Sequence, residues 1–540
     1  DFHPCKNKRN LKYISLTMIQ RLVVLLLLPI GLWAQSTNPD LLIFNGRIID
    51  GTGNSWYRAD IAIRDGKIQS IGNNLPRNAT RILDAQNRIV APGFIDVHTH
   101  LEDDEARDPL AHSFLYDGVT TCITGNCGLS NVNIGKYLNW IDSLKLSINV
   151  ASLIGQNDIR RAVIGRANRN ATPDEMKRME LITEKAMQDG AVGLSTGLIY
   201  IPGTFTPTQE LINLAKIAGR YNGVYATHMR DEGDSVTQAI EEALLIGREG
   251  NLPVQLSHFK LSGQQNWGRS KQTLNMVEEA RANGQDVTID QYPYTASSTS
   301  ISTLIPDHIL ADGQDSIRAR LKRPEIRKEV IASIQKRLKK RGLKHLNYAV
   351  VAYFDADTTY NGKSIEEINL MKGRKHKTKY EAETVMDIQM AGGASAVFHG
   401  MGESDVQRIM KYPFNMIASD ATIRVFNEGM PHPRGYGTNA RVLGKYVREE
   451  KIISLEEAIR RMSSLPAQKF NLKDRGLLKE GMAADIVVFD EKTVRDLATF
   501  EKPHAYSTGF EFVLVNGVLT VDQGKHTQAR GGKALRNQAR

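Results

Sequence analysis

The feature that most restricts the fold of this chain is an alternation of short apolar segments and amphipathic stretches along its middle. The apolar segments, read as strands, are residues 93–98, 120–124, 148–154, 191–195, 223–227, 253–257, 287–290 and 415–419. Helix-like stretches such as 173–189, 208–221, 235–249 and 272–283 separate most of them. Eight strands with helices between them predict an α/β fold, a (β/α)8 TIM-like barrel over residues 93–474. A doubly wound open sheet is the alternative, but no glycine-rich phosphate loop opens the pattern.

Both ends of the chain have a different sequence pattern, in which β-rich segments end at residues typical of turns. Such runs end at Asn45-Gly46 and Asp65-Gly66 near the start and at Asn516-Gly517 near the end. Asn-Gly and Asp-Gly are strong signals for tight turns between strands. We therefore expect a small β-sandwich domain formed from both chain ends, residues 40–92 and 475–536.

The seventh and eighth candidate strands lie about 120 residues apart, far more than an ordinary connection needs. This stretch predicts an insertion between strands 7 and 8, at about 299–412, over the mouth of the barrel. It contains a strongly basic helical segment, 317–341, and a β-like piece, 348–354. We interpret the basic helix as a solvated face rather than a binding surface.

Residues 18–34 have the pattern of a secretory signal peptide. One arginine precedes a short apolar core, which Pro29 interrupts and Ala34 follows. The core is short for a membrane span, so an uncleaved anchor or a buried helix is the weaker alternative. Residues 1–17 precede a plausible initiator, Met18, and look like an upstream artefact. We expect a mature periplasmic or secreted chain that starts near Gln35 and has no stable membrane span.

The positive charge is concentrated at the chain ends. Of the net +10, residues 1–34 carry +4 and residues 525–540 carry +5, which leaves +1 for the body. A nearly neutral body has no electrostatic footprint for nucleic acid.

Metal-binding residue types recur where the candidate strands end, and a β/α barrel gathers those ends on one face. The residues are His98, His100, Cys127, His228, His258 and Asp420. His98 and His100 share a face because successive strand side chains alternate. Imidazole, thiolate and carboxylate together suit zinc better than magnesium or calcium.

These residues belong to an ordered series of motifs. The series is APGFIDVHTH (91–100), GVTT (118–121), GNCG (125–128), LSTGLIY (194–200), THMR (227–230), LSHFK (256–260), YPY (292–294), ASD (418–420), HPRGYGT (432–438) and QARGGKALR (528–536). It resembles the amidohydrolase superfamily, and within it the N-acyl-D-amino-acid deacylases, over roughly residues 40–536.

The resemblance implies a particular metal centre. Many superfamily members bridge two metals with a carboxylated lysine after the fourth strand, but here that strand ends in Ser-Thr-Gly at 195–197. The deacylase branch uses a cysteine from the second strand, and Cys127 stands at the matching place. By resemblance, Cys127, His228 and His258 hold one tight zinc, and His98, His100 and Asp420 form a weaker second site. The alternative for Cys127 is a small buried hydrophobe, which remains our interpretation of Cys122. A disulfide between the two is conceivable after export.

The resemblance also implies roles in catalysis. Asp420 would act as general base and then general acid, the alternatives being a helix cap or a solvated acid. Arg434 has a planar guanidinium that can donate two parallel hydrogen bonds to a substrate carboxylate. Lys260, Tyr292 and Ser298 would grip the carboxylate or the amide, and Tyr200 would lie near the scissile carbonyl. Only motif spacing favours Tyr292 over Tyr294, and we interpret His399 and His432 as structural.

The leading hypothesis is an exported zinc-dependent hydrolase that cleaves N-acyl-D-amino acids to a carboxylate and a free D-amino acid. A dihydroorotase- or hydantoinase-like cyclic amidase is the second hypothesis, disfavoured by the missing lysine. A non-catalytic exported binding protein on the same scaffold is the third, disfavoured by the intact set of metal ligands and by Asp420.

Overall fold

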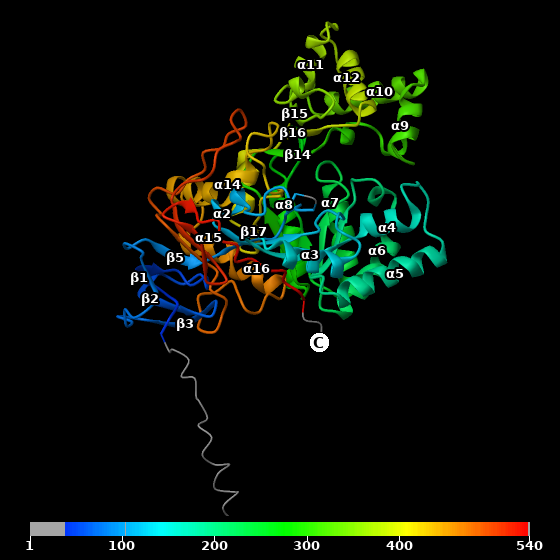
Figure 1. Ribbon diagram of the computed structural model, residues 1–540. Helices are drawn as coiled ribbons and strands as arrows, with labels where there is room; N and C mark the ends of the chain where they lie inside the picture. The colour runs from blue at the N-terminus through cyan, green and yellow to red at the C-terminus, as the bar shows by residue number, and fades with distance from the viewer. Residues whose placement is uncertain (1–37, 103, 538–540) are drawn as a thin grey trace, which may run out of the picture. The chain divides into compact units, whose positions relative to one another are not determined.

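The computed structural model describes residues 38–102 and 104–537. Residues 39–540 form one compact unit (Figure 1). The predicted leader and its cleavage site lie outside the described residues. Within the described ranges, no helix is both long enough and apolar enough to cross a membrane.

Eight parallel strands form the barrel, as the sequence predicts. They are β6 (Phe94–Asp96), β7 (Val119–Thr124), β8 (Asn149–Ser152) with its continuation β9 (Ile154–Gly155), β10 (Gly193–Gly197), β11 (Val224–His228), β12 (Val254–Leu256), β13 (Val287–Gln291) and β17 (Asn415–Ile417). Backbone bonds just beyond β17 and β6 close the barrel. The Asp420 N–H donates to the His98 carbonyl at 2.9 Å, and the His100 N–H donates to the Ala421 carbonyl at 2.9 Å. Closure therefore sets the ends of the first and last strands side by side.

The helices around the barrel follow from local sequence signals, and α5 (Pro173–Gln188) is a clear case. Thr172 and Glu175 form a reciprocal capping box, and Pro173 occupies the first helical position. Met179, Thr183 and Met187 are spaced by four residues and are buried on one face. The other helices of the barrel region are α2 (His112–Leu115), α3 (Ile134–Leu144), α4 (Gln156–Ile164), α6 (Thr208–Arg220), α7 (Val236–Gly250), α8 (Ser270–Ala282), α13 (Glu403–Met410), α14 (Arg434–Arg441), α15 (Leu455–Met462) and α16 (Ser464–Lys469).

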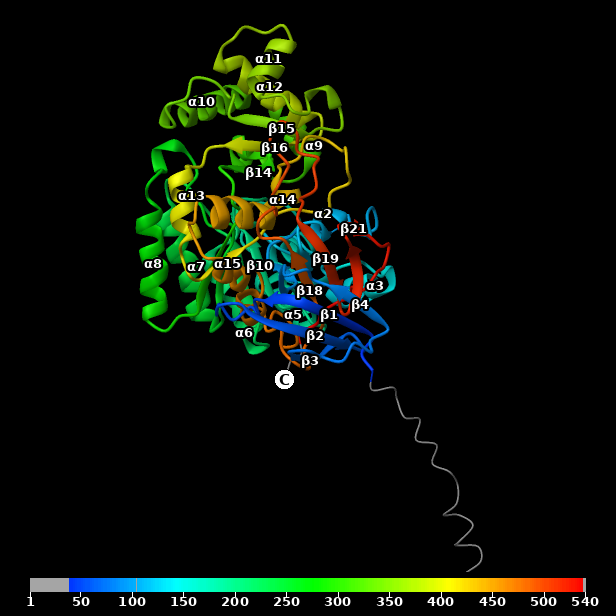
Figure 2. The same cartoon turned by 90° about the vertical axis from the view of Figure 1, so that its left-hand side faces the viewer.

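Strands from both chain ends pair in one nine-stranded sheet (Figure 2). They are β1 (Leu41–Ile48), β2 (Tyr57–Arg64), β3 (Lys67–Gly72), β4 (Arg81–Asp84), β5 (Ile89–Pro92), β18 (Ile486–Phe489), β19 (Phe510–Val515), β20 (Val518–Asp522) and β21 (Lys525–His526). The two ends meet where β5 pairs antiparallel with β18. Apolar side chains from both ends, among them Ile61, Ile486 and Leu514, share one buried core.

The insertion between β13 and β17 has its own sheet and its own apolar core. Its elements are β14 (Ala296–Ser300), α9 (Gln314–Leu321), α10 (Pro324–Lys340), β15 (Ala349–Tyr353), α11 (Ile365–Met371), α12 (Thr378–Met390) and β16 (Ser395–His399). The predicted single basic helix over 317–341 is wrong, because Pro324 starts a new helix after α9. Its apolar side chains, Val330 and Ile334 among them, are buried.

Candidate metal centre

Three imidazoles surround one buried thiol at the carboxyl ends of β6, β11 and β12. The Cys127 Sγ lies 3.3 Å from His98 Nε2, 3.7 Å from His228 Nδ1 and 3.7 Å from His258 Nε2. All four side chains are at least 94% buried. The residues come from four separate positions in the sequence, so the barrel itself brings these ligand atoms together.

A second group adjoins the first and shares His98. His100 Nε2 lies 3.2 Å from Asp420 Oδ1, and His98 Nε2 lies 3.6 Å from the same oxygen. Within the described chain, ligand atoms of His98, His100 and Asp420 lie close enough to hold one ion, as do those of His98, Cys127 and His258. The structure therefore brings all six predicted metal ligands into one continuous cluster.

Three of these residues have left-handed backbone conformations. The φ angles are +53° at Cys127, +35° at His258 and +50° at Asp420. Such angles are uncommon outside glycine and asparagine and cost free energy, which surrounding structure must offset. At each position the chain turns sharply just after a strand, which aims the side chain into the cluster. The left-handed turns therefore help to position three of the candidate ligands.

Glu232 and Asp290 contact the Nδ1 atoms of His258 and His98, on the side of each ring away from Cys127. The His258 Nδ1 lies 2.8 Å from Glu232 Oε1, which also accepts a hydrogen bond from Lys260 Nζ at 2.5 Å. When His258 Nδ1–H donates to Glu232, the Nε2 lone pair faces Cys127. The Asp290 Oδ1 accepts the His258 backbone N–H at 2.7 Å and lies 3.5 Å from His98 Nδ1. We did not predict either carboxylate, although Asp290 ends a candidate strand and Glu232 lies four residues after His228.

The charges of the cluster suit a divalent cation. Burial acts to raise the pKa of the Cys127 thiol, but the facing imidazoles outweigh it and hold that pKa well below its ordinary value. Burial acts likewise on Asp420, where Arg434 and His98 hold the pKa of the carboxyl well below its usual range. Burial also lowers the pKa of His228, which leaves that imidazole neutral with a lone pair to donate. Burial acts to lower the pKa of His98 and of His100, but Cys127 and Asp420 outweigh it and raise both, that of His100 to about 9. A thiolate, a carboxylate and imidazoles are the donor set that zinc takes, and the ion replaces the imidazole protons.

Arg434 lies beside the metal cluster rather than in it. Its Nη1 lies 2.9 Å from Asp420 Oδ2, and its guanidinium lies over the Tyr292 ring at 4.5 Å. Lys260 Nζ lies 5.7 Å from the centre of the same ring. The Arg434 Nη2 donates to the Ser298 carbonyl at 3.3 Å, and the buried Nε has no hydrogen-bond partner among the described residues. Two cations therefore flank one aromatic ring, and the Arg434 Nε–H is available to an anion.

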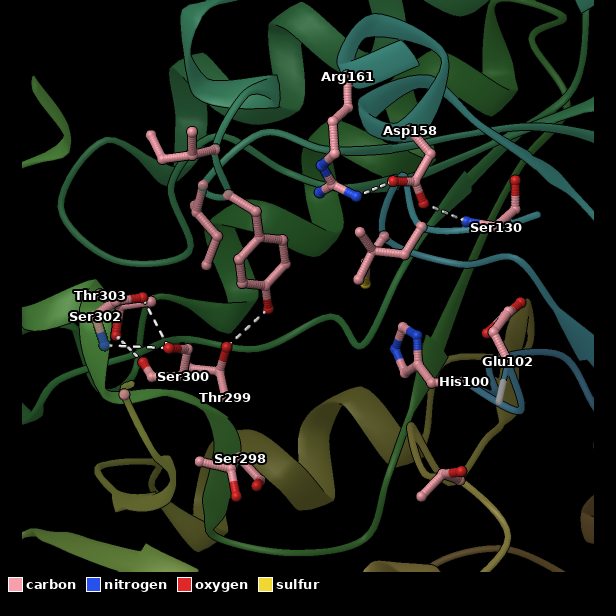
Figure 3. A pocket seen from close by; sticks show the side chains of 18 of the residues that line it. His100, Glu102, Ser130, Asp158, Arg161, Ser298, Thr299, Ser300, Ser302 and Thr303 are labelled. Atoms are coloured by element: carbon pink, nitrogen blue, oxygen red, sulfur yellow. Dashed lines mark hydrogen bonds and ion pairs between the residues drawn. The ribbon is translucent and has the colours of Figure 1, made fainter. Parts of the chain in front are cut away.

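Two cavities open onto this cluster and meet at Asp420. The larger, of about 1390 Å³, is lined by His100, Cys127 and Arg434, and the smaller, of about 450 Å³, is lined by His228, Lys260 and Tyr292. Figure 3 shows His100 and Glu102 on one side of the larger cavity and the hydroxyl-bearing segment 298–303 opposite. β14 of the insertion supplies part of that segment, so the insertion forms one wall of the site.

The remaining predicted substrate residues also reach the cavities. Tyr200 and Ser298 line both of them, and the Tyr200 hydroxyl is bonded to Thr299 Oγ1 at 2.9 Å. Tyr292 lines the smaller cavity, whereas Tyr294 packs against the Arg441 guanidinium and the His432 ring. Cys122 and Cys127 are both free thiols, so the conceivable disulfide does not form.

His432 connects Arg434 to the insertion. Its Nε2–H donates to the Ala296 carbonyl in β14 at 2.9 Å, and its Nδ1 accepts the Arg434 backbone N–H at 3.0 Å. The ring has no exposed surface, and burial holds the pKa of His432 well below its ordinary value. A neutral ring can make both bonds at once, so both nitrogens of His432 are occupied and the ring ties Arg434 to β14.

A closed β/α barrel with a thiolate, imidazoles and a carboxylate at the ends of its strands defines a metal-dependent hydrolase. The Amidohydrolase family model matches residues 81–521, and the chain belongs to that family. It is 35% identical to the D-aminoacylase of Alcaligenes xylosoxydans xylosoxydans, over 92% of this chain and 97% of that one. The protein is accordingly a metal-dependent, D-aminoacylase-like amidohydrolase.

Two solved structures are similar over almost the whole described chain. A D-aminoacylase with a binuclear metal centre, in which one metal activates and the second attenuates, superimposes with a TM-score of 0.78 at 33% identity. The superposition covers 92% of this chain and 100% of the D-aminoacylase chain. An N-acyl-D-glutamate deacylase from Bordetella bronchiseptica, in complex with zinc and a phosphonate inhibitor, gives 0.79 at 33% identity and the same coverage.

Proposed function

We propose that the protein hydrolyses N-acyl-D-amino acids, with zinc, to a carboxylate and a free D-amino acid. The observation that carries the proposal is the convergence of three groups on one pair of cavities. These groups are the thiolate–imidazole cluster around Cys127, the Asp420 carboxylate and the Arg434 guanidinium. The protein's similarity to a D-aminoacylase and to an N-acyl-D-glutamate deacylase supports the same substrate class.

The tight zinc would be held by Cys127, His228 and His258, with a weaker site at His98, His100 and Asp420. Bound there, zinc supplies a water of lowered pKa and polarises the amide carbonyl. Asp420 accepts the proton of the attacking water and passes it to the departing amine. The Asp420 carboxylate suits the first of these steps because Arg434 and His98 keep it ionised.

The substrate's α-carboxylate would bind at Arg434. The Arg434 guanidinium is buried and its Nε–H has no partner among the described residues, so a carboxylate placed there forms a charge-assisted bond away from bulk water. Lys260 and Arg434 both lie near the Tyr292 ring, at 5.7 and 4.5 Å from its centre. Ser298 lines both cavities, and the centre of the Tyr200 ring lies 4.9 Å from that of His228. A free carboxylate at the scissile residue is therefore the expected recognition element.

The test is a hydrolysis panel of N-acetyl-D-amino acids, their L-enantiomers, the matching D-α-carboxamides and cyclic amides such as hydantoins. We expect the free D-acids to be cleaved with the highest kcat/KM. Preference for the carboxamides would remove the role of Arg434, and preference for the cyclic amides would support the cyclic amidase instead.

We also propose that the protein is exported, on the strength of the signal-peptide pattern at 18–34. Fractionation of an expressing Gram-negative host, followed by mass spectrometry of the mature N-terminus, tests this. A periplasmic chain that starts near Gln35 is expected. A cytoplasmic chain that retains residues 18–34 would contradict export.

A further inference from the structure

A second group of metal-binding side chains lies in the insertion, on elements that contribute nothing to the catalytic cluster. His345 lies in the loop before β15, Glu366 in the first turn of α11, His376 between α11 and α12, and Glu381 in the first turn of α12. One ligand atom from each residue can be chosen so that all four lie within 4.8 Å of one another. Figures 1 and 2 both show α11 and α12 at the outer end of the insertion, with the inserted sheet between them and the barrel.

The spacing of the ligand atoms is that of a small coordination shell. His345 Nδ1 lies 2.5 Å from Glu381 Oε1 and 3.8 Å from Glu366 Oε1, and His376 Nε2 lies 2.5 Å from Glu366 Oε1. In a tetrahedral zinc site with bonds of about 2.0–2.2 Å, neighbouring ligand atoms lie about 3.3–3.6 Å apart. The two 2.5 Å contacts are shorter than this spacing and the 3.8 Å contact is longer, so the paired side chains would move apart and His376 would rotate to admit the ion.

The carboxylate of Glu381 needs more charge compensation than its partners give. Its side chain has no exposed surface, and its Oε2 accepts the Leu346 N–H at 2.7 Å. Among the described residues its one ion-pair partner is His345, which is charged only when protonated. Burying a carboxylate without a full counter-charge is costly, and a divalent cation would supply that charge.

The two histidines add a further constraint. Their rings are stacked, with centroids 4.0 Å apart and planes at 18°. For both lone pairs to meet at one ion, His376, which is half exposed, turns out of the stack. Two separate histidine–glutamate ion pairs are the competing explanation.

We propose that His345, Glu366, His376 and Glu381 bind a zinc ion at the outer end of the insertion, here called the insertion site. Two imidazoles and two carboxylates suit zinc better than magnesium or calcium. The ion would join α11, α12 and the loop before β15. It would thereby stabilise the subdomain whose strand β14 lines the catalytic cavity. The proposal stands independently of the proposed reaction.

The test compares zinc bound per full-length chain, after dialysis against a buffered zinc concentration, in wild type, His376→Gln and Glu366→Gln. Both substitutions are at partly exposed positions, so each keeps the fold while removing one ligand. We expect each variant to lose one zinc per chain and the rise in Tm that added zinc gives wild type, with kcat/KM unchanged. His308→Gln is the matched control, because His308 pairs with Glu329 at 3.0 Å in the same insertion. It should keep the wild-type zinc content.

Cobalt distinguishes the insertion site from the catalytic cluster. In Cys127→Ala, cobalt at the insertion site should still give the visible absorption of a tetrahedral ion, without thiolate charge-transfer bands. The double variant Cys127→Ala/His376→Gln should lose that absorption. Equal zinc content and equal zinc-dependent Tm in wild type, His376→Gln and Glu366→Gln would overturn the proposal. Cobalt absorption that His376→Gln leaves unchanged in the Cys127→Ala background would overturn it as well.

Discussion

Replacing Glu232 with glutamine should weaken both the fold and the metal centre. The Glu232 carboxylate holds Lys260 Nζ at 2.5 Å and His258 Nδ1 at 2.8 Å, and lies 3.7 Å from His228 Nε2. Burial acts to raise its pKa, but Lys260 and the two histidines outweigh burial and hold that pKa far below the ordinary value. The side chain is therefore the counter-charge for a buried ammonium and the support for two metal ligands.

The size of the effect follows from these contacts. Removing one partner of a buried ion pair costs about 3–5 kcal/mol of unfolding free energy, because the other charge stays buried. Lys260 is 96% buried, so glutamine at 232 leaves such a charge. Loss of the group that orients a metal-ligating histidine lowers metal affinity by roughly 10–100-fold. Glu232→Gln should therefore lose about 3–5 kcal/mol of stability, measured with chelator present, and bind zinc roughly 10–100-fold less tightly.

A double-mutant cycle tests the cause. Chemical denaturation of Glu232→Gln, Lys260→Met and the double variant gives the coupling energy directly. The double variant should regain much of the lost stability, since neither charge is left alone, but not the lost zinc affinity. The exposed pair Arg107–Glu428 is the control and should show little coupling. Additive stability losses from Glu232→Gln and Lys260→Met would refute the reasoning.

Three further outcomes are expected. Asp420→Asn keeps the shape of the side chain but removes the proton acceptor, so kcat should fall by at least about 10²-fold while the tight zinc stays bound. Near-wild-type turnover would assign the proton transfer to another group. Arg434→Met should cost roughly 2–5 kcal/mol of binding for N-acetyl-D-amino acids and little for their carboxamides, and equal damage to both would indicate a fold defect. The His526 Nδ1 accepts a hydrogen bond from the Gln528 N–H, and its Nε2 is hydrogen-bonded to the Leu110 carbonyl. Burial, together with the nearby His112, lowers the pKa of His526 to about 4. Because the unfolded state takes up this proton first, at about pH 6.5, Tm should fall as pH drops from about 6.5 toward 4, and His526→Gln should flatten that slope. An unchanged slope in the variant would exclude His526.

The clustering of the candidate metal ligands could be predicted because a barrel gathers strand ends that are distant in the sequence. His98, Cys127 and His258 lie far apart in the chain, yet each follows a strand, and parallel strands of a barrel end on one face. Glu232 lies on a loop after its strand, so no periodicity predicts its contact with Lys260. The pairing of Arg434 with Asp420 depends on how α14 packs across the barrel mouth, which sequence spacing does not encode.

The insertion was the least predictable part for a related reason. Its outline followed from the length of the gap between strands, but its basic segment forms two helices because Pro324 starts a second one. The ligands of the insertion site come from loops and first helical turns, at spacings that match no metal-binding motif. Only the packing of α11 against α12 brings Glu366 and Glu381 together.

The most direct test of the central claim is the hydrolysis of one N-acetyl-D-amino acid and its L-enantiomer by metal-stripped protein during titration with zinc. The proposed function predicts no turnover without metal and recovery of D-specific hydrolysis as the Cys127 cluster fills. Cys127→Ala should stay inactive throughout the titration. Turnover by the stripped protein, or full zinc-restored activity in Cys127→Ala, would contradict the assignment of this cluster as the catalytic centre.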